Sequence, residues 1–294
     1  MEIIRSVEKV KNQCSDLIKQ DKQIGFVATM GFFHEGHLNL MTQAKKENDI
    51  VVASIFVNPL QFGPNEDYEN YPRDEEHDIL LAKQTGVDIL FIPTVREMYP
   101  NQMLIRMSVE ARTDVLCGRS RPGHFDGVIT VLTKLFHIIQ PNRTYFGLKD
   151  AQQVAVVDAL IISLNFPIEL IGIETIREQD GLAKSSRNVH LNNEERNEAV
   201  WIYKALMKGQ QLVVDGEKNP AIVVNEVKNV LREHTSGTID YVELVSYPRL
   251  TPIIAINEQV ILATAVKFRK ARLIDNLLLN ENGEIVNQYL QEGI

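Results

Sequence analysis

Two histidines in a short glycine-containing segment, residues 29–37 (TMGFFHEGH), have a spacing that suggests chemistry. The segment follows an apolar run typical of a buried strand, and Gly36 lies between His34 and His37, where a helix would begin. N–H groups at a helix start attract anions, and imidazoles beside them can hydrogen-bond phosphate oxygens as charge develops on phosphorus. The histidines of a zinc protease are spaced differently. We expect phosphate chemistry here, although paired histidines are more often structural or surface residues.

A lysine and an aspartate follow a later predicted strand, in residues 145–153 (YFGLKDAQQ). Gly147 lets the backbone approach a ligand, Lys149 can reach a phosphate, and Asp150 can fix the position of the lysine. The two glutamines that end the segment can recognise a hydroxyl or a carboxylate. A helix start capped by Asp150 is the structural alternative, and it is compatible with such a site.

A polar stretch, residues 183–188 (AKSSRN), contains two cations and two hydroxyls side by side. Lys184 and Arg187 can bind phosphate oxygens, and Ser185 and Ser186 add hydroxyl and backbone donors. The same composition is typical of a solvated turn, so both interpretations stay open at this point.

Two further loops supply polar groups. In residues 55–62 (IFVNPLQF) an Asn-Pro turn follows a strand, and Gln61 stands between apolar neighbours, which suits a small branched polar substrate. In residues 119–125 (RSRPGHF), Arg121 and His124 belong to a basic loop that could cover an anion. Ordinary surface turns have similar sequences.

The elements that must position these groups alternate between strand and helix over roughly the first 175 residues. Short apolar runs predict strands, and the amphipathic segments between them predict helices. The predicted strands are 24–29, 50–57, 87–92, 144–148 and 168–174, and the predicted helices are 37–46, 74–85, 127–139 and 151–164. This alternation predicts a doubly wound parallel sheet of the α/β class, in which ligands bind beyond the carboxyl ends of the strands.

The composition changes near residue 175. Residues 177–188 are polar and contain glycine and serine, as a loop or hinge does. Helices are predicted at 193–214 and from Pro220 to residue 234, and alternating runs at 241–246 and 259–267 predict a small antiparallel sheet. We therefore expect a ligand-binding domain over residues 1–187 and a smaller α+β lid domain over residues 188–294.

The composition excludes several classes of protein. There are 31 basic and 39 acidic residues, and the formal net charge of −8 argues against a broad nucleic-acid-binding surface. Cys14 and Cys117 are far apart in sequence and predict neither a disulfide framework nor a zinc site. The charged N-terminus lacks an apolar signal core, and the apolar runs are too short to span a membrane. We expect a cytoplasmic protein that binds neither nucleic acid nor membrane.

Five ordered motifs closely resemble those of the pantoate–β-alanine ligase family. They are TMGxxHxGH, FVNPxQF, RPGHF, FGxKDxQQ and REQDGLxxSSRN, and they extend from about residue 27 to residue 188. HxGH alone marks a wider nucleotidyltransferase superfamily, but the ordered set is specific. The resemblance implies a Rossmann-like first domain and a homodimer. It also implies condensation of pantoate with β-alanine through a pantoyl adenylate, with ATP as substrate, Mg²⁺ required, and AMP and pyrophosphate released.

The resemblance further implies a role for each matching residue. The catalytic set around the triphosphate is expected to be His34, His37, Lys149, Ser185, Ser186 and Arg187. The ATP site is expected to add Met30, Gly36, Gly147, Asp150, Ile176 and Lys184. Pantoate is expected to bind Gln61 and Gln153, with Met30 beside them, and Asp78 is the candidate metal ligand. The sequence offers no obvious base for the amine of β-alanine.

Three positions depart from the commoner family pattern. Leu148 stands where many members have glutamate, and Lys184 stands where methionine or leucine is frequent, which makes the loop more basic. Cys117 occupies a position that is acidic in some relatives, so the resemblance assigns no carboxylate role there.

Two other functions are compatible with part of the pattern. A nucleotidyltransferase that makes a dinucleotide or a CDP-alcohol shares HxGH but would not require Gln61 or Gln153. A catalytically silent nucleotide-binding protein is the second alternative. Such a protein has no chemical reason to keep two histidines, a lysine and an arginine together, so the pattern favours an enzyme.

Overall fold

The computed structural model describes residues 1–64, 66 and 68–291, and its main sheet has the strand order β1-β4-β3-β2-β5-β6-β10. The strands are β1 (Glu2–Ile4), β2 (Ile24–Thr29), β3 (Ile50–Ile55), β4 (Ile89–Phe91), β5 (Arg143–Gly147), β6 (Glu169–Ile173) and β10 (Gln288–Leu290). Neighbouring strands are parallel, except that β10 pairs antiparallel to β6. The predicted doubly wound parallel sheet is confirmed.

Helices cover both faces of this sheet. Three of them, α1 (Val7–Ile18), α6 (His124–Ile139) and α7 (Ala151–Ser163), contribute to one hydrophobic core. Two others, α2 (Glu35–Glu47) and α3 (Glu75–Gln84), contribute to a second core on the other side. Strands covered on both faces need apolar side chains on both faces, which explains the unalternated runs in the sequence.

The winding of the sheet reverses between β2 and β5. From β2 the chain moves to β3 and β4 on one side, and it later returns through α6 to β5 on the other side of β2. The register pairs Thr29 with Ile55 across β2 and β3, and Phe26 with Thr144 across β2 and β5. The connections that leave β2 and β5 therefore diverge, and this opens the crevice in which doubly wound proteins bind ligands.

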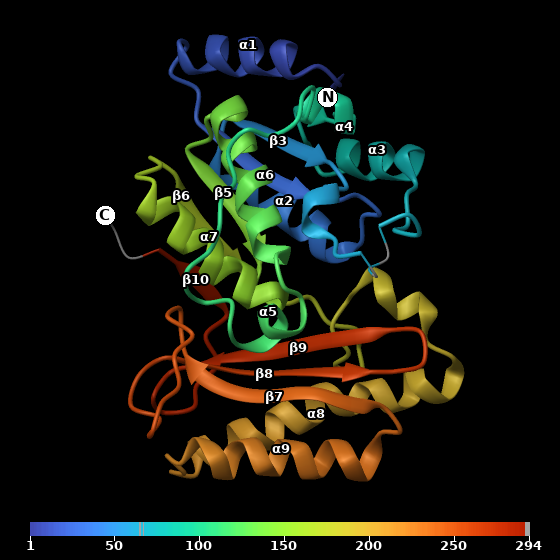
Figure 1. Cartoon of the computed structure of the whole chain (residues 1–294), viewed down its shortest axis with the longest axis vertical. Coiled ribbons are helices and arrows are strands. Elements are labelled where there is room, and N and C mark those ends of the chain that lie inside the picture. The colour runs from blue at the N-terminus through green and yellow to red at the C-terminus, as the bar shows by residue number, and fades with distance from the viewer. Residues whose placement is uncertain (65, 67, 292–294) are drawn as a thin grey trace.

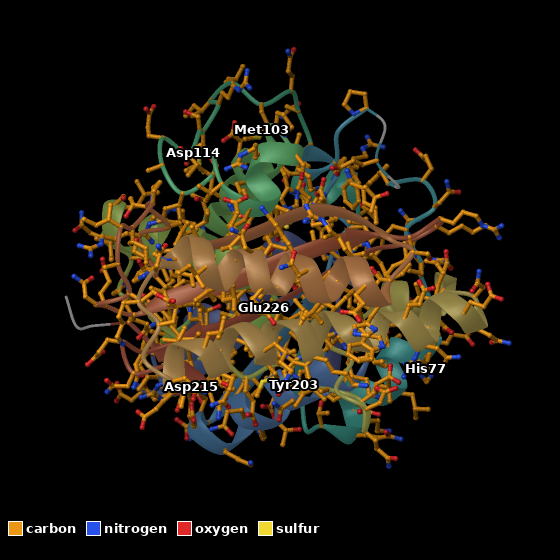
Figure 2. The ribbon with its side chains drawn as sticks, turned by 90° about the horizontal axis from the view of Figure 1, so that it is seen from below. His77, Met103, Asp114, Tyr203, Asp215 and Glu226 are labelled. Atoms are coloured by element: carbon orange, nitrogen blue, oxygen red, sulfur yellow. The ribbon has the colours of Figure 1, made fainter. Side chains whose placement is uncertain are left out.

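A smaller α+β unit lies at one end of the molecule (Figure 1). Its antiparallel sheet has the order β7-β8-β9, and its strands are β7 (Thr238–Ser246), β8 (Val260–Lys267) and β9 (Arg272–Leu279). Helices α8 (Asn193–Val214) and α9 (Pro220–His234) lie side by side across this end of the molecule (Figure 2). Leu262 of β8 packs in the core that α8 and α9 form, whereas Ile261 packs in the core that contains α1, α6 and α7. The small sheet therefore lies between these two hydrophobic cores.

The end of the chain returns to the main sheet. β10 adds an edge strand beside β6, and the Tyr289 hydroxyl donates a hydrogen bond to the Asp158 carboxylate of α7 at 2.8 Å. This return ties the second unit to the first at a second point, and the domain boundary between residues 187 and 188 stays a prediction.

Short elements complete the description. They are the helices α4 (Val95–Met98) and α5 (Leu116–Ser120) and the 3₁₀ turns η1 (Pro59–Gln61), η2 (Leu148–Asp150) and η3 (Ser186–His190). Within the part of the chain that the structure describes, no helix is both long enough and apolar enough to cross a membrane.

Candidate active site

A pocket opens at the carboxyl ends of β2 and β5, where the winding of the sheet reverses. Its wall combines the segment that leads into α2, the turn after β5 and the loop before α8. The predicted site residues that line it are Met30, His34, Gly36, His37, Gln61, Gly147, Lys149, Asp150, Gln153, Ile176, Lys184, Ser185, Ser186 and Arg187. The structure thus brings together groups that are more than a hundred residues apart, whereas Asp78 lies outside this pocket.

The two histidines hold each other at the start of α2. His34 is the N-cap residue, and its Nδ1 accepts a hydrogen bond from the Gly36 N–H at 3.1 Å. The His34 N–H in turn donates to Nδ1 of His37 at 3.3 Å, and the ring centroids are 4.1 Å apart. In a neutral imidazole that accepts at Nδ1, the proton is on Nε2. Both rings therefore carry their proton on Nε2, and both residues line the pocket.

The surroundings keep both imidazoles neutral. Burial, with a smaller contribution from Lys149, lowers the pKa of His34 to about 4. Burial and the neighbouring His34 lower the pKa of His37 to about 3. At neutral pH the pair therefore acts through hydrogen-bond donation and dipoles rather than through fixed charge. A triphosphate placed beside them would favour the protonated forms and raise both pKa values.

Gly36 is required by the His34 cap. A Cβ atom at this position would lie 2.9 Å from Cε1 and 3.0 Å from Nδ1 of His34. Real Cβ atoms essentially never approach so closely, so any side chain here would push the His34 ring away from the helix start. The glycine of the motif is explained by this close approach.

Asp78 holds the turn between β2 and the histidines. Its two carboxylate oxygens accept hydrogen bonds from the N–H groups of Phe32 at 2.7 Å and Phe33 at 2.6 Å. Asp78 is 1% exposed and comes from α3. Gly31 and Phe32 have positive φ values of 84° and 53°, so this turn needs such support. Both oxygens are engaged with the backbone, and the metal role of Asp78 stays a prediction that this geometry does not support.

Lys149 and Asp150 lie in the turn that follows β5. Lys149 Nζ is 3.8 Å from an Asp150 carboxylate oxygen, and the lysine side chain is 17% exposed. The Asp150 side chain is 54% exposed. The partial loss of hydration at the pocket wall would raise the pKa of its carboxyl, but the charges of Lys149 and Arg187 outweigh this effect, and the pKa is lowered. The carboxylate is therefore ionised and orients the lysine within the pocket.

The loop before α8 also lines the pocket. The Lys184 N–H donates to the Ile176 carbonyl at 2.9 Å, and the Lys184 ammonium pairs with Glu35 of α2 at 3.1 Å. The Ser185 hydroxyl accepts from the Arg187 N–H at 3.3 Å and begins η3. The Lys184–Glu35 pair connects this loop directly to the helix that carries His37.

Gln61 is fixed in an inward-facing position. It is 7% exposed, its amide nitrogen contacts the Met30 sulfur at 3.0 Å, and its amide oxygen accepts from Asn58 at 3.2 Å. α6 passes very close to this turn, because a Cβ at Gly127 would lie 2.3 Å from the Leu60 carbonyl. The turn that carries Gln61 can therefore pack this closely against α6 because residue 127 is a glycine.

The adjacent glutamines of α7 have different surroundings. Gln152 is buried, and its amide nitrogen donates to the carbonyls of Arg112 and Val115 at 2.9 Å while its oxygen accepts from the Gly118 N–H at 3.2 Å. Gln153 lines the pocket. Successive helical residues point about 100° apart, so one side chain supports a loop while the other reaches the ligand space.

Several pocket residues were not predicted from the sequence. Arg121 and His124, which the sequence indicated only as part of a basic loop, also line the pocket. Glu66 pairs with Arg121, a contact between residues 55 positions apart for which the sequence carries no signal. α6 adds an apolar wall formed by Val128, Val131, Leu132 and Leu135. The signal for this wall is the nearly continuous apolar sequence of α6.

The donor set fits a magnesium ion carried by a nucleotide. Among the described residues, no group of three or more histidine, cysteine, aspartate or glutamate side chains is arranged to hold a metal. Mg²⁺ on a nucleotide is usually held by one or two carboxylates together with phosphate oxygens and water. Of the residues that the structure describes around this pocket, Asp150 and Glu174 supply carboxylates.

Comparison with known proteins identifies the family. A family model described as pantoate-beta-alanine ligase matches residues 2–278. The chain belongs to the pantoate–β-alanine ligase family. A relative from Bacillus subtilis (strain 168) named pantothenate synthetase is 57% identical over 280 residues, which is 95% of this chain and 98% of the relative. A pantothenate synthetase from Geobacillus sp. (strain WCH70) is 54% identical over 280 residues, covering 95% and 99% of the two chains.

Solved structures of this ligase family share the whole fold. The crystal structure of pantothenate synthetase from Thermus thermophilus matches with a TM-score of 0.88 and 43% identity, over 94% of this chain and 99% of that one. The pantoate-beta-alanine ligase of Francisella tularensis, complexed with beta-gamma ATP and beta-alanine, matches with a TM-score of 0.78 and 35% identity. That match covers 95% of this chain and 97% of that one. The chain is therefore a ligase with the fold of this family.

Proposed function

We infer that this pocket joins pantoate to β-alanine with ATP as the energy source, by way of a pantoyl adenylate. One observation carries the inference. His34 and His37, two neutral imidazoles that carry their proton on Nε2, line one pocket together with Lys149 and Arg187 at the carboxyl ends of β2 and β5. Such a cluster stabilises charge on phosphate oxygens without supplying a covalent nucleophile.

In the first step a carboxylate oxygen of pantoate attacks the α-phosphorus of ATP. A bond forms between that oxygen and phosphorus, the bond to the bridging oxygen of pyrophosphate breaks, and pyrophosphate leaves with the negative charge. His34 and His37 donate to the oxygens that gain charge, and Lys149 and Arg187 neutralise it. Ser185 and Ser186 add donors from the loop.

Pantoate is proposed to bind beside the two glutamines of the pocket wall. Gln61 and Gln153 offer amide groups for its hydroxyls and carboxylate, and Met30 lies against the Gln61 amide. The apolar wall of α6 faces the same pocket and suits the branched hydrocarbon part of the substrate. Pantoate is thereby held with its carboxylate toward the triphosphate.

The nucleotide would lie along the opposite edge. Gly147 leaves room for close approach, since a Cβ there would meet no other atom within 4 Å. Asp150 and the backbone of Ile176 and Lys184 are the groups proposed to hold the adenosine. Mg²⁺ bound with ATP would neutralise phosphate charge, and Asp150 and Glu174 are the carboxylates that the described part of the pocket wall offers it.

In the second step the amine of β-alanine attacks the acyl carbon of the adenylate. The C–N bond forms, the bond from the acyl carbon to the AMP oxygen breaks, and AMP leaves with the bonding electrons. The two protons that the β-alanine ammonium group loses are released to solvent. The mixed anhydride is prone to hydrolysis, so water must be kept out. We propose that the loop carrying Lys184 and Arg187 acts as the lid, with the Lys184–Glu35 pair as its latch to α2.

The assembly and the location of the protein are also proposals. We propose a homodimer and a cytoplasmic location, and both rest on the family resemblance. Sedimentation equilibrium should give about twice the 33.4 kDa mass of the chain. A single-chain mass at micromolar concentration would contradict the dimer.

Exchange of labelled pyrophosphate into ATP tests the proposed first step. The exchange should require pantoate and proceed without β-alanine, because adenylate formation is reversible. If the folded protein shows no pantoate-dependent exchange, the adenylate mechanism is wrong. A nucleotidyltransferase would instead retain the transferred nucleotide in its product, which mass spectrometry distinguishes.

A further inference from the structure

A second cavity, of about 860 Å³, lies between the two domains and shares part of its wall with the nucleotide pocket. The described residues common to both are Arg121, His124, Lys149, Asp150, Gln153, Ser185 and Arg187. This second cavity offers a second substrate a place beside the reacting centre that the nucleotide need not occupy. A second substrate bound there would be recognised by a side chain of this shared wall.

Arg121 presents a carboxylate-binding geometry in this wall. Its Nε donates to one oxygen of Glu66 at 2.7 Å and its Nη2 donates to the other at 2.6 Å. Two parallel hydrogen bonds of this kind are the arrangement by which guanidinium groups recognise planar carboxylates. The Arg121 and Glu66 side chains are 23% and 24% exposed, so solvent and small solutes reach the pair.

His124 fixes the other side of the guanidinium. Its Nδ1 is 2.8 Å from the Gln61 carbonyl, which can only accept, so Nδ1 carries the proton. Nε2 is therefore unprotonated and accepts a hydrogen bond from Arg121 Nη1 at 3.1 Å. Burial and the charge of Arg121 lower the pKa of His124 to about 4, so the ring stays neutral and leaves the positive charge of Arg121 available.

The triphosphate of ATP and the carboxylate of β-alanine need different cationic side chains in the pocket. Lys149 and Arg187 surround the position proposed for the triphosphate. β-Alanine is a zwitterion, and its amine must face the acyl carbon, so its carboxylate needs a cation further from the phosphates. Arg121 belongs to the shared wall, and two of its N–H groups already hold a carboxylate, that of Glu66.

We propose that Arg121 binds the carboxylate of β-alanine and that Glu66 occupies this guanidinium until the substrate displaces it. The proposal rests on the function proposed above, and it adds the recognition of the second substrate. The Glu66 carboxylate then acts as an internal competitor, and the neutral His124 acts as a positioning residue that holds the guanidinium plane. Amines without a carboxylate would fail to displace Glu66, which explains selection of an amino acid over a simple amine.

The test separates the two steps of the reaction in Arg121→Gln and Arg121→Lys variants. Pantoate-dependent pyrophosphate exchange, which needs no β-alanine, should fall by a much smaller factor than kcat/KM for β-alanine. The KM for β-alanine should rise about 10- to 100-fold in Arg121→Gln, as expected for losing a hydrogen-bonded charge partner. An unchanged KM would overturn the proposal, and absent exchange in the unmodified protein would instead overturn the proposed function.

A substrate analogue tests recognition of the carboxylate itself. The unmodified protein should prefer β-alanine strongly over 3-aminopropanamide, whereas Arg121→Gln should lose most of this preference. A merely structural role of Arg121 would slow both amines equally, and that result would contradict the proposal. Should Arg121→Gln fail to fold, the same ratio measured in Arg121→Lys decides, since a lysine cannot form the bidentate pair.

Two more variants complete the design. Arg119→Gln is the matched control, because Arg119 lies in the same segment but is 61% exposed and pairs with Glu243 of the small sheet. Its KM for β-alanine should not change. Glu66→Gln removes the competing charge, so its KM for β-alanine should fall severalfold; a rise would show that Glu66 supports Arg121 rather than competes with the substrate.

Discussion

The Asp78 carboxylate accepts hydrogen bonds from the backbone N–H groups of Phe32 and Phe33, and so fixes the turn that leads into His34. Phe32 adopts a left-handed conformation at φ 53°, which is costly for a residue with a side chain. A buried carboxylate that satisfies two consecutive N–H groups holds such a turn in place. The position of His34 and His37, the proposed catalytic histidines, therefore depends on a residue from a different helix, α3.

Replacing Asp78 with asparagine tests this positioning role. The amide offers one oxygen, so one N–H group of the turn loses its acceptor, and we expect a loss of about 1–3 kcal/mol in the free energy of unfolding. Pyrophosphate exchange should fall about tenfold or more, while the Mg²⁺ concentration for half-maximal rate should stay the same. Chemical denaturation and a magnesium titration measure both effects.

A changed magnesium requirement would favour the metal role instead. Asp74→Asn is the control, because the Asp74 side chain caps α3 through the His77 N–H at 3.1 Å rather than holding the turn before His34. It should lose some stability and keep its exchange rate. Equal losses of exchange in both variants would contradict the positioning role.

The two histidines predict a pH dependence of stability. Their pKa values in the folded protein, about 4 for His34 and about 3 for His37, lie below the ordinary value of 6.5. Between these values the unfolded chain binds more protons than the folded one, so the free energy of unfolding should decrease as pH falls from about 6.5 toward 4. Urea unfolding at a series of pH values measures this slope.

A His34→Gln variant should show a shallower slope over that interval. Glutamine does not titrate, and its amide oxygen can still accept a hydrogen bond from a backbone N–H. An identical slope in the variant would mean that His34 is not held neutral by the fold.

Lys149 is expected to matter for the reaction and little for the fold. Its side chain lies at the pocket beside Asp150, 17% exposed, and it is not a member of the core that α6 and α7 form. We expect Lys149→Ala to reduce pyrophosphate exchange by about 10²- to 10³-fold, the effect of removing one donor to developing charge. The melting temperature should change by only a few degrees. Near-normal exchange would remove the proposed role.

Gly36→Ala tests the close approach at the helix start. The added methyl group would displace the His34 ring, break its bond to the residue 36 N–H, and misplace both Nε2–H donors. We expect exchange to fall at least tenfold, because small displacements of catalytic groups are costly. In the control Gly63→Ala, the new Cβ would lie 3.8 Å from its nearest neighbour, so the rate should hold. Equal rates in both variants would show that the motif tolerates a side chain.

The central strand and the parallel sheet were predictable from the sequence because local apolar runs determine them. β2 has the predicted bounds, 24–29. The predicted strand 50–57 ends earlier, at Ile55, because the chain turns there and Asn58 caps η1. The predicted helix 37–46 begins at Glu35, because His34 serves as its N-cap, a position that serine, threonine or aspartate usually fills. The short strand β10 has too few residues to carry a pattern.

The sheet topology and the motifs predicted that the site residues come together. They did not predict which residues hydrogen-bond to the site residues and hold them in place. Asp78 contacts Phe32 across 46 positions, and Arg121 contacts Glu66 across 55. No periodicity or propensity reports such pairs, because they depend on how helices and loops pack after the chain has folded. The metal role suggested for Asp78 stays a prediction, and the sequence carries no signal for the hydrogen bonds that Asp78 accepts from the backbone of Phe32 and Phe33.

Heavy-oxygen transfer from pantoate to AMP tests the central claim most directly. With the carboxylate oxygens of pantoate labelled, a complete reaction with ATP and β-alanine should yield AMP that carries one heavy oxygen, because that oxygen bonds to the α-phosphorus before the acyl carbon is released. Mass spectrometry of the AMP should therefore show a single label and unlabelled pyrophosphate. Unlabelled AMP, with heavy oxygen in another phosphate product, would contradict activation of pantoate as an adenylate in this pocket.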